Sequence, residues 1–230
     1  MNLDGRVALI TGAKGGLGTY VTNAFLSAGA TVAGVSRSIR DADFPHEQFA
    51  GIAAELSTPE QASGAVAKVV QRFGSIDILV HLLGAYAGGS PIHESPATEL
   101  DRMLDLNFRS AFFVLQAAVP LLRQSGAGRV LAVGSKAGLH PQSLSGAYNA
   151  SKAALASLIQ TAALENRDAR LTANIVLPGT MDTAANRAAN PNVDPATWVQ
   201  PCQVANLLVY LASDLARDVN GAMIPVSGRE

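Results

Sequence analysis

Seven short runs of apolar residues, separated by stretches with helical spacing, constrain the fold of this 230-residue chain more than any other feature. The runs are almost continuous in apolar residues, which is typical of parallel strands covered on both faces. Strands that alternate with helices in this way indicate right-handed βαβ units and one parallel sheet. The predicted strands are residues 6–11, 31–35, 51–55, 76–82, 129–133, 171–176 and 222–226.

The clearest helix signal begins at Thr58, a predicted N-cap that is followed by Pro59 at the first helical position. Gln61 is placed to complete a capping box, and Gly74 follows the last apolar position, Phe73. Further helices are predicted over about 96–124, from about 147, and over 201–212. The sequence contains no internal repeat or linker. We therefore predict a single α/β domain over residues 1–230, doubly wound around a parallel sheet.

The composition excludes several classes of protein. The 17 basic and 18 acidic residues give a net charge of −1, which offers no electrostatic footprint for nucleic acid or an anionic membrane. A lone cysteine, Cys202, excludes an intramolecular disulfide framework, and no two histidines have metal-site spacing. The sequence has no signal-peptide layout and no apolar run near the ~18 residues of a membrane span. We expect a cytoplasmic protein without a metal.

A glycine-rich turn, residues 11–18, follows the first predicted strand and opens the first helix. Gly12, Gly16 and Gly18 would allow a tight turn, close approach of the backbone to a pyrophosphate, and close packing of helix on strand. A purely structural turn is the alternative, but the position after the first strand of a doubly wound pattern favours dinucleotide binding. The turn lacks the Gly-Lys-Ser/Thr ending of a P-loop.

The end of the second strand indicates which dinucleotide is bound. A carboxylate at that place would accept hydrogen bonds from the adenosine ribose of NAD, whereas this chain has Ser36 and Arg37. Arg37 can pair with a 2′-phosphate through two hydrogen bonds, and Lys14 in the glycine turn adds charge. The alternative is a solvated arginine in a loop. We predict NADP in preference to NAD.

Tyr148 and Lys152 lie four residues apart and share one helical face. A cation beside a phenol is expected to lower its pKa from about 10, which would make the pair a general acid and base. Ser135 follows the fifth strand, at the edge where open α/β sheets bind ligands, and could hydrogen-bond a substrate carbonyl. Asn107 lies within the long predicted helix, either as a satisfied amide or at a kink that holds a water.

These motifs, in this order, resemble those of the short-chain dehydrogenase/reductases. The resemblance covers essentially the whole chain and implies a seven-stranded Rossmann sheet of order 3-2-1-4-5-6-7 and hydride transfer between a nicotinamide and a carbonyl or alcohol. It also implies that Tyr148 moves the proton, Ser135 orients the substrate oxygen, Lys152 binds the nicotinamide ribose, and Asn107 supports a relay water. With the turn and second strand, the predicted cofactor-binding residues are Gly12, Lys14, Gly16, Leu17, Gly18, Ser36, Arg37, Glu55, Leu56, Leu83, Gly84, Tyr148, Lys152, Pro178, Gly179, Met181 and Thr183.

Two segments depart from the family pattern. After the fourth strand the usual Asn-Asn-Ala-Gly is replaced by residues 81–84, His-Leu-Leu-Gly, and after the third strand Glu55 stands in place of an aspartate. Residues 84–89, 177–187 and the region of Trp198 are similar to dihydropteridine reductase. The predicted function is thus NADP-dependent reduction of a carbonyl or oxidation of an alcohol, a small-molecule substrate. The alternatives are pterin reduction and a regulator that binds a dinucleotide without catalysis.

Residues 180–200 are the predicted substrate lid. Candidates to line the substrate pocket are Tyr86, His93, His140, Arg187 and Trp198. Only 15% of residues are charged, against roughly 25% in an average domain, so either the core is large or part of the surface is buried against another copy. The family resemblance implies a homodimer or homotetramer built on the helices that carry Asn107 and Tyr148. Apolar residues expected there are Phe112, Phe113, Leu155, Leu158 and Ile159.

Overall fold

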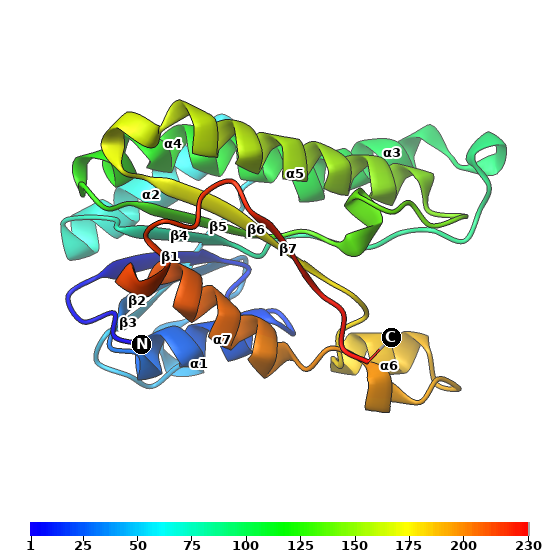
Figure 1. The fold of residues 1–230 in the computed structure, drawn as a ribbon, viewed down its shortest axis with the longest axis horizontal. Coiled ribbons are helices and arrows are strands. Elements are labelled where there is room, and N and C mark those ends of the chain that lie inside the picture. Colours follow the sequence, from blue (N-terminus) through cyan, green and yellow to red (C-terminus); the bar gives the residue numbers. More distant parts are fainter. Residues whose placement is uncertain (230) are drawn as a thin grey trace.

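A computed structural model describes residues 1–229 and contains one seven-stranded parallel sheet with helices on both faces (Figure 1). The strand order is β3-β2-β1-β4-β5-β6-β7, which confirms the predicted doubly wound α/β fold. The strands are β1 (Val7–Thr11), β2 (Thr31–Ser36), β3 (Phe49–Ala53), β4 (Ile78–His81), β5 (Arg129–Val133), β6 (Thr172–Pro178) and β7 (Met223–Val226).

The helices form two layers. On one face lie α2 (Pro59–Phe73), α3 (Ala97–Leu104), α4 (Ser110–Gln124) and α5 (Gly146–Glu165), and on the other α1 (Gly18–Ser27) and α7 (Pro201–Ala212) (Figure 1). A short helix, α6 (Ala184–Ala189), lies at the end of the molecule where the strands finish. Side chains of one strand point alternately to the two layers, so Leu9 joins the core under α2, α4 and α5 while Ile10 joins the core over α1 and α7.

Local sequence signals fix the ends of α2. The Thr58 hydroxyl accepts a hydrogen bond from the Gln61 backbone N–H at 3.3 Å, as an N-cap does. The Gln61 side chain instead accepts from the Ser57 backbone N–H at 3.0 Å, one residue earlier than in a capping box. Gly74 ends the helix in the left-handed conformation, with φ of +84°.

The long helix predicted over about 96–124 is interrupted by a π turn. Regular α3 ends at Leu104, residues Asp105–Arg109 form the π turn, and α4 continues from Ser110. Such turns widen one coil of a helix and are frequent at functional sites. Asn107 lies inside this turn and is completely buried.

Two predicted strands are shifted in the structure. The third was expected at 51–55, but β3 begins at Phe49, which pairs with Val32 of β2. The fourth was expected to begin at residue 76, but pairing with β1 begins only at Ile78. Ile76 lies before the first paired residue of β4, and its apolar side chain is buried in the core without being part of the sheet.

The surface that was expected to meet a second copy is less apolar than predicted. Leu155 and Ile159 are buried in the core beneath α5, and Phe113 and Leu158 are partly buried against it. They therefore pack within this chain, and the expectation that they form surplus surface was wrong. Phe112 is 45% exposed. Within residues 1–229, no helix is both long and apolar enough to cross a membrane.

Candidate active site

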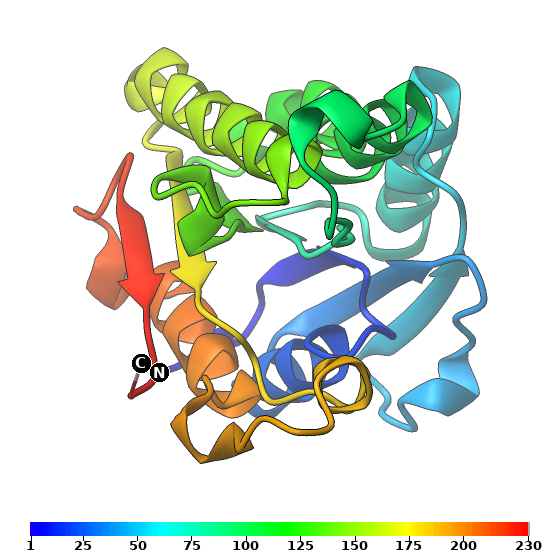
Figure 2. The ribbon, with the colours of Figure 1, turned by 90° about the vertical axis from the view of Figure 1, so that its right-hand side faces the viewer.

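The loops that carry the predicted site gather at the carboxyl end of the sheet. Figure 2 looks onto this end and shows the loop after β4, the loop after β5 and the segment after β6 around one another. The loops after β4 and β5 are bonded together, since the Gly89 N–H donates to the Leu144 carbonyl at 2.7 Å. Open α/β sheets bind their ligands at this edge.

Tyr148 and Ser135 meet at this edge although thirteen positions separate them. Ser135 leaves β5 and caps a short 3-10 turn, where its hydroxyl accepts from the Ala137 N–H at 3.2 Å. Tyr148 lies in the first turn of α5, close enough to the Ser135 side chain for that hydroxyl to influence the pKa of the phenol. The two hydroxyls expected to act on one substrate oxygen are thus adjacent.

Burial, more than charge, sets the protonation of this pair. Burial raises the pKa of the Tyr148 phenol, the hydrogen bond with Ser135 opposes that rise, and the nearby Tyr86 adds to it. Burial, Ser135 and Tyr86 are the causes of this shift, and the lowering of the Tyr148 pKa by Lys152 stays a prediction. The Lys152 Nζ lies over the Tyr148 ring, 5.9 Å from its centroid.

Lys152 is itself buried, with 6% of its surface exposed. Its Nζ donates to the Val133 carbonyl at 3.4 Å, and burial lowers the pKa of the ammonium to about 8. A Cβ placed on Gly84 would lie 3.0 Å from that Nζ. Gly84, the one residue of the family's Asn-Asn-Ala-Gly motif that this chain retains, thus lets the loop pass close to the ammonium.

Asn107 ties three elements together from within the π turn. Its Oδ1 accepts from the Ala85 N–H at 2.8 Å, and its Nδ2 donates to the Ala85 carbonyl at 3.0 Å and to the Ser151 Oγ at 2.9 Å. The amide thereby connects the loop after β4 to α5, one residue away from Lys152. Of the two predicted states of Asn107, the structure shows the satisfied amide, within a helix deformed by the π turn, and the bound water stays a prediction.

The glycine turn has the shape that a pyrophosphate requires. Gly12 has φ of +70°, and a Cβ on Gly18 would lie 2.0 Å from the Gly12 carbonyl oxygen. Among residues 1–229, no side chain caps the N-terminus of α1 at Leu17, so its first N–H groups face the turn. A Cβ on Gly16 would lie 3.4 Å from Thr183, which brings the turn against the segment after β6. These residues fit a bound dinucleotide.

The residues predicted to bind the adenosine half of the dinucleotide differ in their contacts and exposure. Lys14 forms an ion pair with Asp43 at 2.9 Å, a partner that the sequence did not indicate. The Lys14 N–H donates to the Ser36 Oγ at 3.4 Å, and Arg37 is exposed just after β2. The side chain of Leu56 belongs to the core, while Glu55 is exposed.

At the nicotinamide end, β6 leads directly into the segment predicted to hold the ring. Pro178 pairs with Val226, and the Gly179 N–H donates to the Val226 carbonyl at 2.9 Å. Thr183 caps α6 and accepts from the Asn186 N–H at 3.3 Å. Leu83 and Met181 are partly buried against the two core clusters.

His81 is a buried histidine whose environment the sequence did not predict. It takes the place of the first asparagine of the family motif and pairs in register with Thr11 of β1. Its Nδ1 shares a hydrogen bond with the Thr11 hydroxyl at 3.0 Å, while Nε2 has no hydrogen-bond partner within residues 1–229. Burial and the charge of Lys152 lower the pKa of His81 to about 3.

Among the residues predicted to line the substrate pocket, one contacts Tyr148, and three others are buried or paired with a neighbouring side chain. The Tyr86 ring meets the Tyr148 ring edge to face, with 5.0 Å between centroids, and so lies at the site. Trp198 is buried, Arg187 is ion-paired with Asp182, and His93 is paired with Glu94.

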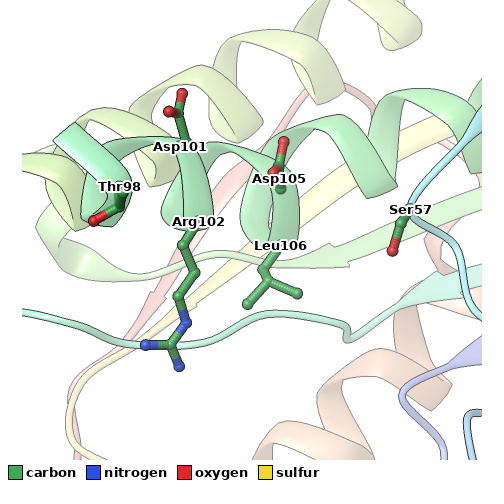
Figure 3. Close-up of a pocket in the computed structure, with 6 residues that line it drawn as sticks. All are labelled: Ser57, Thr98, Asp101, Arg102, Asp105 and Leu106. Carbon is green, nitrogen blue, oxygen red and sulfur yellow. The ribbon is translucent and has the colours of Figure 1, made fainter.

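A separate cavity of about 500 Å³ lies beside α3 (Figure 3). Its walls come from α3, the π turn and the loop that precedes α2, and Arg102 projects away from Asp101 there. None of its lining residues belongs to the group around Tyr148. The lining residues are Ser57, Thr98, Asp101, Arg102, Asp105 and Leu106.

Comparison with known proteins decides the family. The family described as short chain dehydrogenase matches residues 6–194. This chain is a short-chain dehydrogenase. The predicted family is thereby confirmed, and the protein is an oxidoreductase of a group whose solved members include complexes with a nicotinamide dinucleotide.

Relatives of this short-chain dehydrogenase act on different molecules. The 3-oxoacyl-[acyl-carrier-protein] reductase FabG of Vibrio cholerae is 28% identical over 99% of this chain and 98% of its own. The 2,5-dichloro-2,5-cyclohexadiene-1,4-diol dehydrogenase LinX of Sphingobium indicum is 30% identical over 98% and 96%. The 3-ketoacyl-(acyl-carrier-protein) reductase of Brucella melitensis, solved with NADH, has a TM-score of 0.89 at 26% identity and covers 99% of both chains.

Proposed function

We propose that this short-chain dehydrogenase transfers a hydride between NADP(H) and a small carbonyl or alcohol substrate, with Tyr148 as general acid and base. The observation that carries the proposal is the convergence of Tyr148, Ser135 and Lys152 at the carboxyl edge of the sheet, beside a glycine turn shaped for a pyrophosphate. A module that merely bound a dinucleotide would have no need of the paired hydroxyls.

The chemistry assigned to each residue follows from its position. The cofactor, when bound, supplies the hydride for reduction or accepts it in oxidation. Tyr148 donates its phenolic proton to the carbonyl oxygen as that oxygen gains charge, and Ser135 donates a second hydrogen bond to it. Because burial raises the pKa of Tyr148, the phenol holds its proton at neutral pH, which suits the reductive direction. Lys152 hydrogen-bonds the nicotinamide ribose, and Asn107 keeps α5 and the loop after β4 in place.

Tyr148→Phe tests the catalytic assignment. We expect the variant to bind NADPH with a Kd within twofold of the wild type and to lose about 10²- to 10⁴-fold in kcat, as loss of a general acid does. Binding is measured by fluorescence of the reduced nicotinamide, and turnover by its oxidation over a panel of ketones, 3-oxoacyl thioesters, quinones and pterins. Tyr210→Phe, a change on the exposed side of α7, is the matched control.

The same panel separates the alternative functions. A wild-type protein that binds NADPH tightly and oxidises it with no carbonyl would be a regulator. A protein that oxidises it with pterins alone would be a pterin reductase. Retention of more than a tenth of the turnover in Tyr148→Phe would contradict the role given to the phenol.

The preference for NADP rests on the basic residues at the adenosine end. Lys14 and Arg37 lie on either side of Ser36, and no carboxylate within residues 1–229 directly follows β2. Asp43 already pairs with Lys14, so Arg37 is left to make most of the bidentate contact with a 2′-phosphate.

Arg37→Ala tests this preference. We expect the ratio of Kd(NADH) to Kd(NADPH), which should exceed one in the wild type, to fall about tenfold or more because a charge-assisted contact is lost. The matched control is Arg40→Ala, an exposed arginine three positions later whose backbone N–H bonds Asp43. A wild-type preference for NADH, or an unchanged Kd for NADPH in Arg37→Ala, would overturn the assignment.

We further propose that the whole chain is one nucleotide-binding unit and that residues 180–200 are its lid. An isolated bridge between Met181 and Val199 closes the base of this segment. Within it, Arg187 pairs with Asp182, and the Gln200 amide donates to the same carboxylate at 3.3 Å. The two ends of the lid are thus paired with each other, and Thr183 brings the lid against the glycine turn.

A further inference from the structure

The two loops beside Tyr148 expose large apolar side chains toward solvent. Tyr86 is 62% exposed and Ile92 82%, both after β4, while Leu139 is 41% and Leu144 50% exposed after β5. We call these four residues the apolar rim. In Figure 2 the two loops that carry the rim lie together above the end of the sheet. Exposed apolar side chains gathered at one place mark a binding surface more often than scattered ones do.

The apolar rim is built on the catalytic residue itself. The Tyr86 ring packs edge to face on the Tyr148 ring, and its hydroxyl bonds the Ser145 Oγ at 3.1 Å, three residues before Tyr148. A Cβ on Gly146 would lie 3.0 Å from the Ile92 side chain, which places Ile92 against the first turn of α5. The rim therefore begins where the substrate carbonyl must bind.

Leu144 has a left-handed backbone, with φ of +60°, which is uncommon for a leucine. Its carbonyl is fixed by the Gly89 N–H, and a Cβ on Gly88 would lie 2.8 Å from that carbonyl oxygen. The surroundings thus hold an unfavourable conformation that turns half of an apolar side chain toward solvent. Strain of this kind is retained at sites where it serves a ligand.

Polar side chains next to Ile92 in the chain, and the arginine of the lid, have partners of their own. His93 and Glu94, next to Ile92 in the chain, lie 3.3 Å apart and are 80% and 65% exposed in their side chains. Arg187 of the lid is held by Asp182, with a second hydrogen bond at 2.9 Å. These groups offer little to a polyhydroxylated or anionic substrate.

We propose that the substrate is a carbonyl compound whose carbonyl carries an apolar ring, and that the apolar rim packs on this ring. The inference rests on the proposed function, because Tyr148 and Ser135 fix the position of the carbonyl oxygen. The remainder of the substrate must then extend from that oxygen past Tyr86, toward Leu144 and Ile92. An aromatic or alicyclic group buries apolar area on these side chains, whereas a sugar would leave its hydroxyls facing them.

A matched series of ketones tests the proposal. Steady-state kinetics with NADPH compare 4-phenylcyclohexanone, 4-hydroxycyclohexanone and acetone, which share the reacting carbonyl and differ in what reaches the apolar rim. We expect kcat/KM to be at least tenfold higher for the phenyl compound than for the hydroxy compound. Tyr86→Ser and Leu144→Asn should each reduce this ratio fivefold or more, mainly through KM. Asparagine is chosen at 144 because it tolerates the left-handed backbone.

A control variant and a binding measurement distinguish failure of the apolar-substrate proposal from failure of the proposed function. Leu215→Ser removes another exposed leucine, at the amino end of the sheet, and should leave the ratio unchanged. Saturation-transfer NMR of 4-phenylcyclohexanone with NADPH measures binding without turnover. Equal or better use of the hydroxy compound would overturn the apolar substrate and leave the proposed function intact. Binding of the phenyl compound that is lost in Tyr86→Ser, but without turnover of any carbonyl, would overturn the proposed function and support the rim.

Discussion

At the scale of single residues, burial decides which protons this site holds. The phenol of Tyr148 stays protonated near neutrality, Lys152 has a pKa of about 8, and His81 stays neutral down to about pH 3. Each shift follows from moving the charged form out of water. Under the proposed function, the proton that Tyr148 would give to a carbonyl is therefore held on a group that keeps it at neutral pH.

His81 makes the folded chain sensitive to acid. A base whose pKa is lower in the folded chain than in the unfolded one binds more protons when unfolded, so its contribution to stability falls as pH falls. For His81 this window runs from about 6.5 down to about 3. We expect a loss of about 2 kcal/mol between pH 7 and pH 5 from this residue. Urea unfolding of the wild type and of His81→Asn, at both pH values, measures it.

Carboxylates titrate in both the wild type and His81→Asn. The difference between the two proteins in the stability lost from pH 7 to pH 5 therefore reports His81. His46→Asn, a change at an exposed histidine, is the matched control and should retain the acid loss of the wild type. An equal loss of stability in His81→Asn and the wild type would contradict the role of His81.

At the scale of elements, the spacing of Tyr148 and Lys152 predicted a shared helical face, and the position of Ser135 after β5 predicted the same edge of the sheet. The structure brings the three together because each rule depends on local geometry. The bond of His81 to Thr11 depends on the register of β4 on β1, which no local pattern specifies. The bonds of Asn107 likewise depend on a π turn that helical spacing does not reveal.

The π turn joins the loop after β4 to α5 through one amide. Asn107→Ala would leave the partly buried N–H and carbonyl of Ala85 without this partner, and the Ser151 hydroxyl, which still donates to the Tyr148 carbonyl, would lose one hydrogen bond. We expect a loss of about 1–3 kcal/mol in the free energy of unfolding. We also expect kcat to fall at least tenfold with KM changed less than threefold, because α5 carries Tyr148 and Lys152.

Asn107→Asp distinguishes positioning from simple stability. It keeps the oxygen that accepts from Ala85 but loses both donated hydrogen bonds, so a partial loss of kcat is expected. Unfolding by urea and steady-state kinetics are measured on both variants. Full kcat in an Asn107→Ala protein that is destabilised would show that the amide serves the fold alone.

At the scale of the whole molecule, the low charge and the exposed side of α4 bear on assembly. Leu155 and Ile159 are used inside the chain, so the argument for a second copy now rests on fewer residues than the sequence suggested. Phe112 is 45% exposed, and the centroid of its ring lies 6.3 Å from the ring centroids of both Phe108 and Phe113. Phe112 is thus the exposed member of a partly buried aromatic group, and a partner that covered it would remove apolar area from water.

We expect a homodimer or homotetramer in which α4 and α5 meet the same helices of another copy, as the family resemblance implies. A two-fold interface of this kind brings Phe112 of one copy close to the same patch of the other. A charged side chain at position 112 would therefore be repelled by the same charge on the other copy. Phe112→Glu should therefore shift the assembly to a smaller species at micromolar concentration, as measured by light scattering after size-exclusion chromatography. Leu215→Glu, at the other end of the molecule, should leave the mass unchanged. A monomeric wild type would contradict this expectation, and burial against another copy would no longer explain the low charge of the chain.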